Sequence, residues 1–258
     1  MRIGLVLSGG GARSFAHLGV IKALTELQLP IHKISGVSSG ALAGAFYGAG
    51  YSPEEIFRRV TETNFLRLMR PAFSRVGLIK LNQLEAALAP YFKDLTFADL
   101  NPRLIVSATD FNSAITIYYS EGSIVRPLMA SIALPILFQP VTYQDRLLVD
   151  GGLLNNLPVE CLLGHCDFII GVHINPLDYQ SDITTFRGMF ERTLRMAIYN
   201  NVEPRLKLCH FFIEPPQLKN YSLLDIKHAR EMFDCGYEHT MLLGDNLLAA
   251  IEQFQNGE

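Results

Sequence analysis

The chain begins with a short apolar strand, three consecutive glycines and a helix, and this succession restricts the folds open to it. Residues 3–7 are aliphatic or glycine, and residues 9–11 are all glycine. Apolar residues then recur with helical spacing along residues 16–27. A second strand, residues 34–37, runs into a Ser/Gly turn and a helix of small residues at 41–47. Two strands joined through a helix form a βαβ unit, so the sequence predicts a parallel sheet with a right-handed crossover.

The rest of the chain continues to alternate strands and helices. Ser52, followed by a proline and two glutamates, predicts a capped helix. The apolar run 168–174 is typical of a strand buried on both faces. No repeat or linker separates the elements, so we expect residues 1–258 to form one α/β domain with a mostly parallel central sheet covered by helices. Further strands are expected at 103–111, 115–120 and 147–149, and further helices at 185–200 and 222–254.

The composition argues against several classes of protein. The 22 Lys and Arg residues against 25 Asp and Glu give a net charge of −3, whereas nucleic-acid binders usually carry a basic excess. The four cysteines are too few for a disulfide scaffold and form no CxxC pair, so a zinc ribbon is not expected. No apolar stretch reaches the roughly 18 residues that span a bilayer. The first residues also lack the apolar length of a signal peptide. We therefore expect a cytoplasmic protein that does not bind nucleic acid.

The sharpest local motif is Gly36-Val37-Ser38-Ser39-Gly40, a G-x-S-x-G sequence between a strand and a helix. A serine on so tight a turn projects its hydroxyl clear of the backbone, but the turn crowds the residues two positions away on each side. Glycine at those positions removes the clashing Cβ atoms. Small residues also close ordinary turns, yet the strand before and the helix after are those that a nucleophile requires. Ser38 is therefore the candidate nucleophile.

The glycines at positions 9, 10 and 11 form the second motif. Their backbone N–H groups line a concave turn between a strand and a helix, which suits a phosphate or a developing oxyanion. As a dinucleotide fingerprint the motif fits poorly, because Ser14 stands at the third glycine position, and no Gly-Lys-Ser/Thr follows as a phosphate-binding loop requires. Arg13 either supports a phosphate-bearing substrate or the oxyanion, or lies on the surface in the first turn of the helix.

Asp150-Gly151-Gly152, at the end of a strand, is the third motif. Ligands of open parallel sheets bind beyond the carboxyl ends of the strands, so Asp150, Ser38 and the glycine turn are expected to share one rim. An ordinary Asp-Gly turn would have the same sequence, and only the combination with the other two motifs gives Asp150 a functional interpretation.

In this order, the three motifs resemble those of the patatin-like phospholipases, lipid acyl hydrolases with a Ser–Asp dyad. The resemblance extends to about residue 175 and implies a three-layer α/β/α patatin-like fold, with residues 176–258 completing or covering the sheet. Ser14 departs from the glycine usual in the family, but this leaves the three preceding glycine amides in place. The residues that carry the resemblance are 9–13, 36–40, 130–135, Phe138, Pro140, Val141, 150–152 and 155–158.

This resemblance implies a mechanism without a metal or organic cofactor. Ser38 attacks an ester carbonyl of a lipid, phospholipid or lysophospholipid and forms an acyl-enzyme. The amides of Gly9, Gly10 and Gly11 stabilise the oxyanion, while Asp150 takes the serine proton and later activates water. An ordinary aspartate has a pKa near 3.9 and a histidine one near 6.5, so aspartate is the weaker base by about 2.6 units, or roughly 3.5 kcal/mol. Either burial raises the pKa of Asp150 or the oxyanion hole contributes more.

Three alternatives remain open at this stage. His173 follows both Ser38 and Asp150 in the sequence and could complete a Ser–His–Asp triad. His17, by contrast, lies at the edge of a helical apolar face and is expected only to pack. The glycine turn could instead hold a nucleotide or another anion without catalysis. A regulatory protein could also use the same scaffold.

Residues 51–80 combine basic and large apolar side chains, including Arg58, Arg59, Phe65 and Phe73. Such a stretch could cover the acyl pocket as a lid or rest on an anionic membrane surface. An apolar inner face with a solvated basic outer face explains the same pattern. Peripheral membrane contact is therefore one expectation among these, and the sequence does not indicate an oligomeric state.

Overall fold

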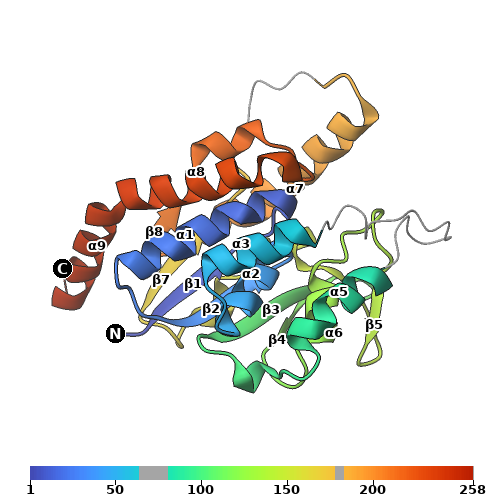
Figure 1. The fold of residues 1–258 in the computed structure, drawn as a ribbon, viewed down its shortest axis with the longest axis horizontal. Helices are drawn as coiled ribbons and strands as arrows, with labels where there is room; N and C mark the ends of the chain where they lie inside the picture. Colours follow the sequence, from blue (N-terminus) through green and yellow to red (C-terminus); the bar gives the residue numbers. More distant parts are fainter. Residues whose placement is uncertain (64–80, 178–182, 258) are drawn as a thin grey trace.

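A single sheet organises the computed structural model, which describes residues 1–63, 81–177 and 183–257. Within these residues eight strands pair in the order β5-β6-β3-β2-β1-β7-β8, with β4 also paired to β3 (Figure 1). The strands are β1 (Ile3–Leu7), β2 (Ile31–Val37), β3 (Arg103–Asp110), β4 (Ile115–Tyr119), β5 (Val141–Tyr143), β6 (Arg146–Asp150), β7 (Phe168–Val172) and β8 (Phe211–Ile213).

The α-helices that the structure describes follow the strands in the expected alternation. They are α1 (Phe15–Glu26), α2 (Ser39–Gly48), α3 (Pro53–Glu62), α5 (Asn82–Phe92), α6 (Val125–Ser131), α7 (Phe186–Leu206), α8 (Ala229–Leu242) and α9 (Gly244–Asn256). Ser52 caps α3 through the predicted capping box with Glu55. None of the helices in the described ranges is both long and apolar enough to cross a bilayer.

The predicted parallel sheet is confirmed for the centre of the molecule. Strands β3, β2, β1, β7 and β8 are parallel to their neighbours in that series. The antiparallel pairs lie on the β3 side, where β4 and β6 pair with β3 and β5 pairs with β6. The sheet is therefore mostly parallel, with an antiparallel extension that carries the Asp150 strand.

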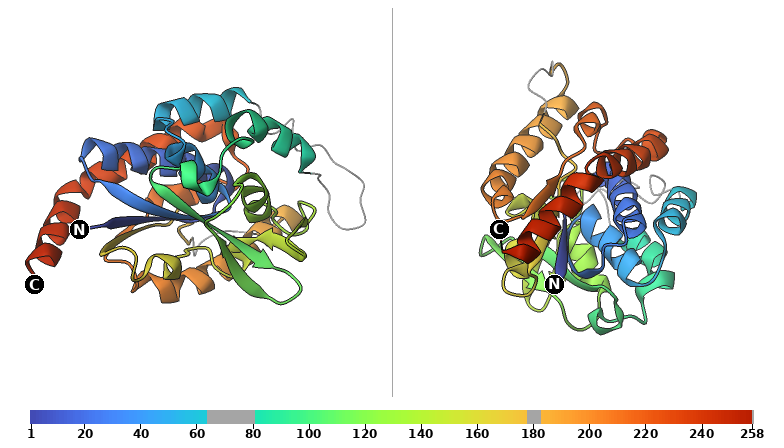
Figure 2. Two further views of the ribbon diagram at one scale, coloured as in Figure 1. Left: turned by 90° about the horizontal axis from the view of Figure 1, so that it is seen from below. Right: turned by 90° about the vertical axis from the view of Figure 1, so that its left-hand side faces the viewer.

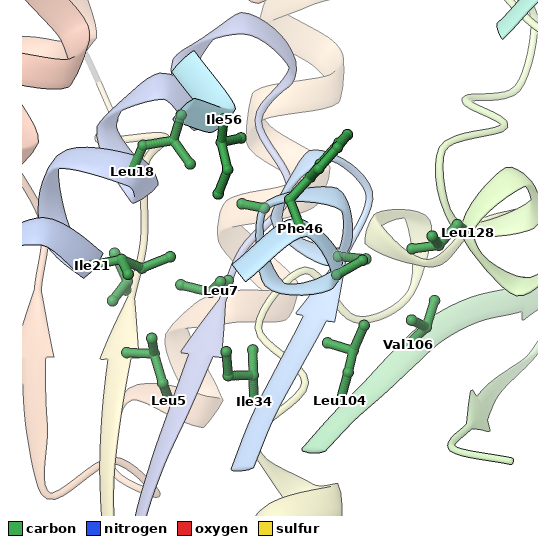
Figure 3. Packing of buried hydrophobic residues seen from close by; sticks show 14 of the residues in the cluster. Leu5, Leu7, Leu18, Ile21, Ile34, Phe46, Ile56, Leu104, Val106 and Leu128 are labelled. Carbon is green, nitrogen blue, oxygen red and sulfur yellow. The ribbon is translucent and has the colours of Figure 1, made fainter. Parts of the chain in front are cut away.

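Alternate residues of the central strands face two separate helical layers. Leu5 and Leu7 pack with α1 and α2, whereas Val6, between them, packs with Ile198 of α7 on the opposite face. Figure 2 shows α1, α3 and α8 on one side of the sheet and α7 on the other. Figure 3 shows the layer formed by α1 and α2, where Ile21 and Phe46 face the side chains of the strands. This arrangement confirms the three-layer α/β/α architecture.

Two glycines let α1 and α8 approach at backbone distance. A Cβ at Gly19 of α1 would lie 2.0 Å from the carbonyl oxygen of Phe233. A Cβ at Gly236 of α8 would lie 2.1 Å from that of Ala16. A side chain at either position would force the helices apart. These glycines therefore allow α8, from the C-terminal part of the chain, to pack closely against α1.

The expected helix over 222–254 is wrong in its continuity. A 3-10 turn at Ile226–His228 precedes α8, and the chain turns at Leu243 before α9 begins at Gly244. The helical periodicity of the sequence did not reveal this break, although Gly244, a poor helix former, stands at it. The helix expected at 185–200 extends further, to Leu206. Of the stretch 51–80, residues 64–80 lie outside the described residues.

Candidate active site

Strand β3 brings Ser38 and Asp150 together, although they are far apart in the sequence. Val106 pairs with β2 on one edge and with β4 on the other. Ala108, two residues later, pairs with β4 and with Asp150 of β6. Because β4 pairs with the same edge of β3 at both positions, β2 and β6 lie end to end along the other edge of β3. The chain leaves β2 at Ser38 and β6 ends at Asp150, so the two residues meet at this junction.

Ser38 occupies the sharp turn between β2 and α2 with φ 54° and ψ −129°. A positive φ is unfavourable for a residue with a side chain and persists only where the surroundings enforce it. The flanking glycines meet that demand. A Cβ at Gly36 would lie 2.7 Å from the Cα of Ala41, and one at Gly40 would lie 2.4 Å from the carbonyl oxygen of Leu7. The turn therefore has the crowding that the motif predicts.

Ser131, at the end of α6, holds the backbone of this turn. Its Oγ accepts a hydrogen bond from the Ser38 N–H at 2.8 Å and donates one to the carbonyl oxygen of Ser107 at 2.7 Å. Ser131 is fully buried. Sequence reasoning gave it no role, although it lies in the 130–135 block that supported the family resemblance.

Asp150 is buried, and its carboxylate interacts with the nearby Ser38 side chain. The Gly152 N–H also donates to it, at 2.8 Å. Burial raises the pKa of Asp150 from 3.8 to about 6, although the Ser38 side chain and the Gly152 N–H both favour the charged form. The carboxylate is therefore a base of nearly the strength of a histidine, whose ordinary pKa is about 6.5.

The glycine loop lies directly against Ser38, and its peptide groups are held from several sides. A Cβ at Gly9 would lie 2.9 Å from the Cβ of Ser38. The Gly9 carbonyl accepts hydrogen bonds from the side-chain amides of Asn156, at 3.2 Å, and Asn175, at 2.5 Å. Neither asparagine was assigned this role from the sequence, because the contacts join residues about 150 positions apart.

Only two of the three expected glycine amides remain available to a ligand. The Gly10 N–H already donates to the Oγ of Ser39 at 3.1 Å. Among the described residues, no hydrogen bond uses the N–H of Gly9 or Gly11. Of the three amides expected to form the oxyanion hole, the Gly10 amide is therefore bonded to a side chain, and those of Gly9 and Gly11 are open among the described residues.

Arg13 does not reach the pocket. It is fully buried, and its Nε donates to the carbonyl oxygen of Tyr221 at 2.9 Å. Its Nη1 donates to the Oδ1 of Asn175 at 3.2 Å. The alternative surface position is therefore wrong, because the guanidinium is buried and links the glycine loop to the C-terminal part of the chain. Ser14 has φ −61°, which any residue adopts, so this position requires no glycine.

A largely apolar pocket of about 450 Å³ contains Ser38, Asp150 and the glycine loop in its walls. One face of α2 runs along it, since Ser39, Leu42, Ala43 and Phe46 recur at helical spacing. Figure 3 shows Phe46 beside Ile56 and Leu18, which also line the pocket. Further apolar lining comes from Phe15, Val60, Leu84, Leu88, Ile132, Leu134, Leu137, Phe138, Leu194, Ile198, Leu223, Leu224 and Ile226.

The two histidines considered from the sequence lie outside this pocket. His173 is buried, and its Nδ1 is 2.6 Å from the Oε1 of Glu214. The structure does not bring it to Ser38. His17 is buried with its Nε2 2.7 Å from the carbonyl oxygen of Ser8, and burial lowers its pKa to about 4, so it is neutral. Within the described ranges, no three His, Cys, Asp or Glu side chains are grouped as a metal ion requires.

Part of this sequence is similar to known proteins. Residues 5–163 match the family described as patatin-like phospholipase. An uncharacterised NTE family protein of Mycobacterium tuberculosis is 33% identical over 177 residues, which cover 67% of this chain and 49% of that protein. Lysophospholipase NTE1 of Kluyveromyces lactis is 27% identical over 92% of this chain and 19% of its own length. The chain thus spans about half of the mycobacterial relative and a fifth of the yeast one.

The fold has a counterpart among solved structures. VipD from Legionella pneumophila matches 95% of this chain and 67% of its own with a TM-score of 0.56, at 15% sequence identity. At this identity the likeness concerns the fold alone.

Proposed function

The chain belongs to the patatin-like phospholipase family, and we propose that it hydrolyses acyl esters of lipids with Ser38 as nucleophile and Asp150 as base. One observation carries the proposal. A strained serine and a buried carboxylate whose pKa is about 6 interact in the wall of one apolar pocket, beside two open backbone amides. These are the parts that acyl transfer requires: a nucleophile, a base, oxyanion donors and a site for the acyl chain.

In the acylation step, Asp150 accepts the hydroxyl proton as the Ser38 Oγ attacks the ester carbonyl. A bond forms between Oγ and the carbonyl carbon, and the carbonyl oxygen becomes an oxyanion stabilised by the Gly9 and Gly11 amides. The tetrahedral intermediate then collapses. The bond to the leaving alkoxide breaks, and the proton held by Asp150 passes to that oxygen, so that an alcohol leaves and an acyl-enzyme remains.

In the deacylation step, a water molecule replaces the alcohol. Asp150 accepts a proton from the water as its oxygen attacks the acyl carbon, and the same amides stabilise the second oxyanion. Collapse releases the fatty acid and returns the proton from Asp150 to Ser38. Because Asp150 must be ionised at the start of each half-reaction, activity is expected to fall as the pH decreases below about 6.

We propose a lipid with one acyl chain in the pocket, such as a lysophospholipid or a simple fatty acyl ester, as the substrate. The pocket volume of about 450 Å³ is in the range of small-molecule sites, roughly 300–1,000 Å³. Its walls are mainly aliphatic and aromatic along the α2 face, which suits a hydrocarbon chain. The name lysophospholipase, which several relatives carry, supports the same class.

Hydrolysis of lysophosphatidylcholine and of para-nitrophenyl esters by the purified chain tests this proposal. We expect fatty acid release by the wild type and a loss of at least about 1,000-fold in Ser38→Ala with the fold retained. Ser120→Ala, at an exposed position, serves as the control. Equal hydrolysis by wild type and Ser38→Ala would contradict the assignment.

We also propose that residues 1–258 act as one hydrolase domain in the cytoplasm that contacts membranes peripherally to collect its substrate. The pairing of β8 with β7 and the glycine contacts between α1 and α8 support a single domain. Leu224 lines the pocket and is 40% exposed, and the neighbouring loop exposes Ile136 to 66%. Apolar side chains beside the pocket favour contact with a lipid surface. Cosedimentation with liposomes tests this, and no binding to either neutral or anionic vesicles would contradict it.

A further inference from the structure

Ser39, the residue after the nucleophile, has a hydroxyl that the mechanism above does not use. It is half-buried, lines the pocket beside Ser38 and begins helix α2. Its Oγ accepts the Gly10 N–H at 3.1 Å. A hydroxyl has one proton to donate besides its acceptor sites. No hydrogen bond between described residues takes up that proton, so it is available to a ligand in the pocket.

The neighbouring groups restrict what this proton can meet. The side-chain partner of the Asp150 carboxylate is Ser38, and its backbone partner is Gly152. The Gly9 carbonyl of the glycine loop is already bonded to two asparagine amides. The acceptor that arrives in this space during the reaction is the substrate carbonyl oxygen, which gains negative charge as Ser38 attacks.

We propose that the Ser39 hydroxyl is a third oxyanion donor, through which the Gly10 amide acts on the substrate indirectly. This inference rests on the proposed function of Ser38. A hydroxyl that accepts a hydrogen bond becomes a better donor, because the two bonds polarise each other. The Gly10 N–H therefore strengthens the bond that Ser39 donates. Ser39 is a catalytic residue in this account, since it touches the reacting oxygen.

The test compares Ser39→Ala, Ser39→Thr and Ser120→Ala with the wild type. Each protein is assayed for kcat and KM on a para-nitrophenyl ester and for inhibition by an alkyl trifluoromethyl ketone and by the matching alkyl alcohol. The ketone forms a tetrahedral oxyanion on Ser38, whereas the alcohol only fills the pocket. Phosphonylation of Ser38 by a fluorophosphonate is measured first, because its absence in the wild type would overturn both this inference and the proposed function.

We expect Ser39→Ala to lower kcat by about 10- to 100-fold with little change in KM. Loss of one oxyanion donor typically costs 100- to 1,000-fold, and the Gly10 N–H that the substitution frees would replace part of it. The ketone should bind at least about 10-fold more weakly, and the alcohol as before. Ser39→Thr, which keeps the hydroxyl, should recover most of the rate, and Ser120→Ala should match the wild type.

Other results would overturn the inference while Ser38 is still phosphonylated. An unchanged kcat in Ser39→Ala would show that the hydroxyl takes no part. A higher kcat would show that Ser39 competes with the substrate for the Gly10 amide. Equal weakening of ketone and alcohol binding would indicate a role in pocket structure only. If Ser39→Ala fails to fold, Ser39→Cys keeps the shape with a weaker donor, and an unchanged ketone affinity in that variant would equally contradict the proposal.

Discussion

The two parts of the chain contribute to the candidate site in different ways. Residues 5–163 carry every motif that the sequence displays and match the family along their length. The part from residue 164 onward displays none, yet it holds the glycine loop in place. The Arg13 guanidinium donates to the Tyr221 carbonyl, and the Ala12 N–H donates to the Leu223 carbonyl at 2.8 Å. Part of this support comes from backbone carbonyl groups, which any residue can provide, so it leaves no motif in the sequence.

The largest expected effect is the loss of activity when Asp150, the base in the motif-bearing part, is replaced, compared with replacement of His173 in the C-terminal part. Asp150→Asn keeps an acceptor for the Gly152 N–H but cannot take the serine proton, so kcat/KM should fall by at least about 1,000-fold. The measurement is ester hydrolysis above pH 7. His173→Asn, in which the side-chain amide can still donate toward Glu214, should retain activity within a few-fold. The opposite ranking would favour a histidine triad.

The support from the C-terminal part is tested by Arg13→Met. This change removes the buried bonds to Tyr221 and Asn175, so unfolding should become easier by about 3 kcal/mol. The Asn175 Oδ1 loses its Arg13 donor, whereas the Tyr221 carbonyl keeps the hydrogen bond from Arg195. Urea denaturation measures the change. Arg2→Met, which removes an exposed ion pair to Asp167, should cost less than about 1 kcal/mol. Equal losses in the two variants would mean that the buried contact contributes no special stability.

Much of the fold and part of the site could be predicted because they depend on local rules. The alternation of strands and helices indicated the layers, and the crowded turn around Ser38 demands glycine at positions 36 and 40. The roles of Ser131 and Asn175 could not be predicted, since serine and asparagine occur in many settings and their partners lie far away in sequence. The position of Arg13 was wrong for the same reason, because its acceptor is a backbone carbonyl.

A smaller effect should appear in the pH dependence of stability. The folded chain retains the Asp150 proton up to a pKa of about 6, whereas an ordinary aspartate loses it near 3.8. The folded state therefore binds more protons between these values, and this residue's contribution to stability decreases as the pH rises from about 4 to 6. The expected difference is about 2 to 3 kcal/mol.

Asp150→Asn isolates this contribution, because asparagine does not titrate. The variant should be more stable than the wild type above pH 6, and the difference should disappear near pH 4. Denaturation midpoints across this range provide the measurement. A constant difference at every pH would contradict a raised pKa for Asp150.

The smallest effect on activity is expected from Ser131, which supports the Ser38 turn from within the motif-bearing part. Ser131→Ala removes the acceptor for the Ser38 N–H, so the strained turn should relax and kcat should fall by about 10-fold. Ser35→Ala is a matched control, since Ser35 is also buried and donates to the Pro158 carbonyl without contacting the turn. A similar loss of kcat in both variants would attribute the effect to general destabilisation.

The central claim is that Ser38 attacks the substrate with Asp150 as its base, and peptide mapping after fluorophosphonate treatment tests it most directly. The account predicts one phosphonyl group on the peptide that contains residue 38, no label in Ser38→Ala, and labelling in Asp150→Asn that is slower by at least about 100-fold. A label on another serine, or undiminished labelling without the carboxylate, would contradict it.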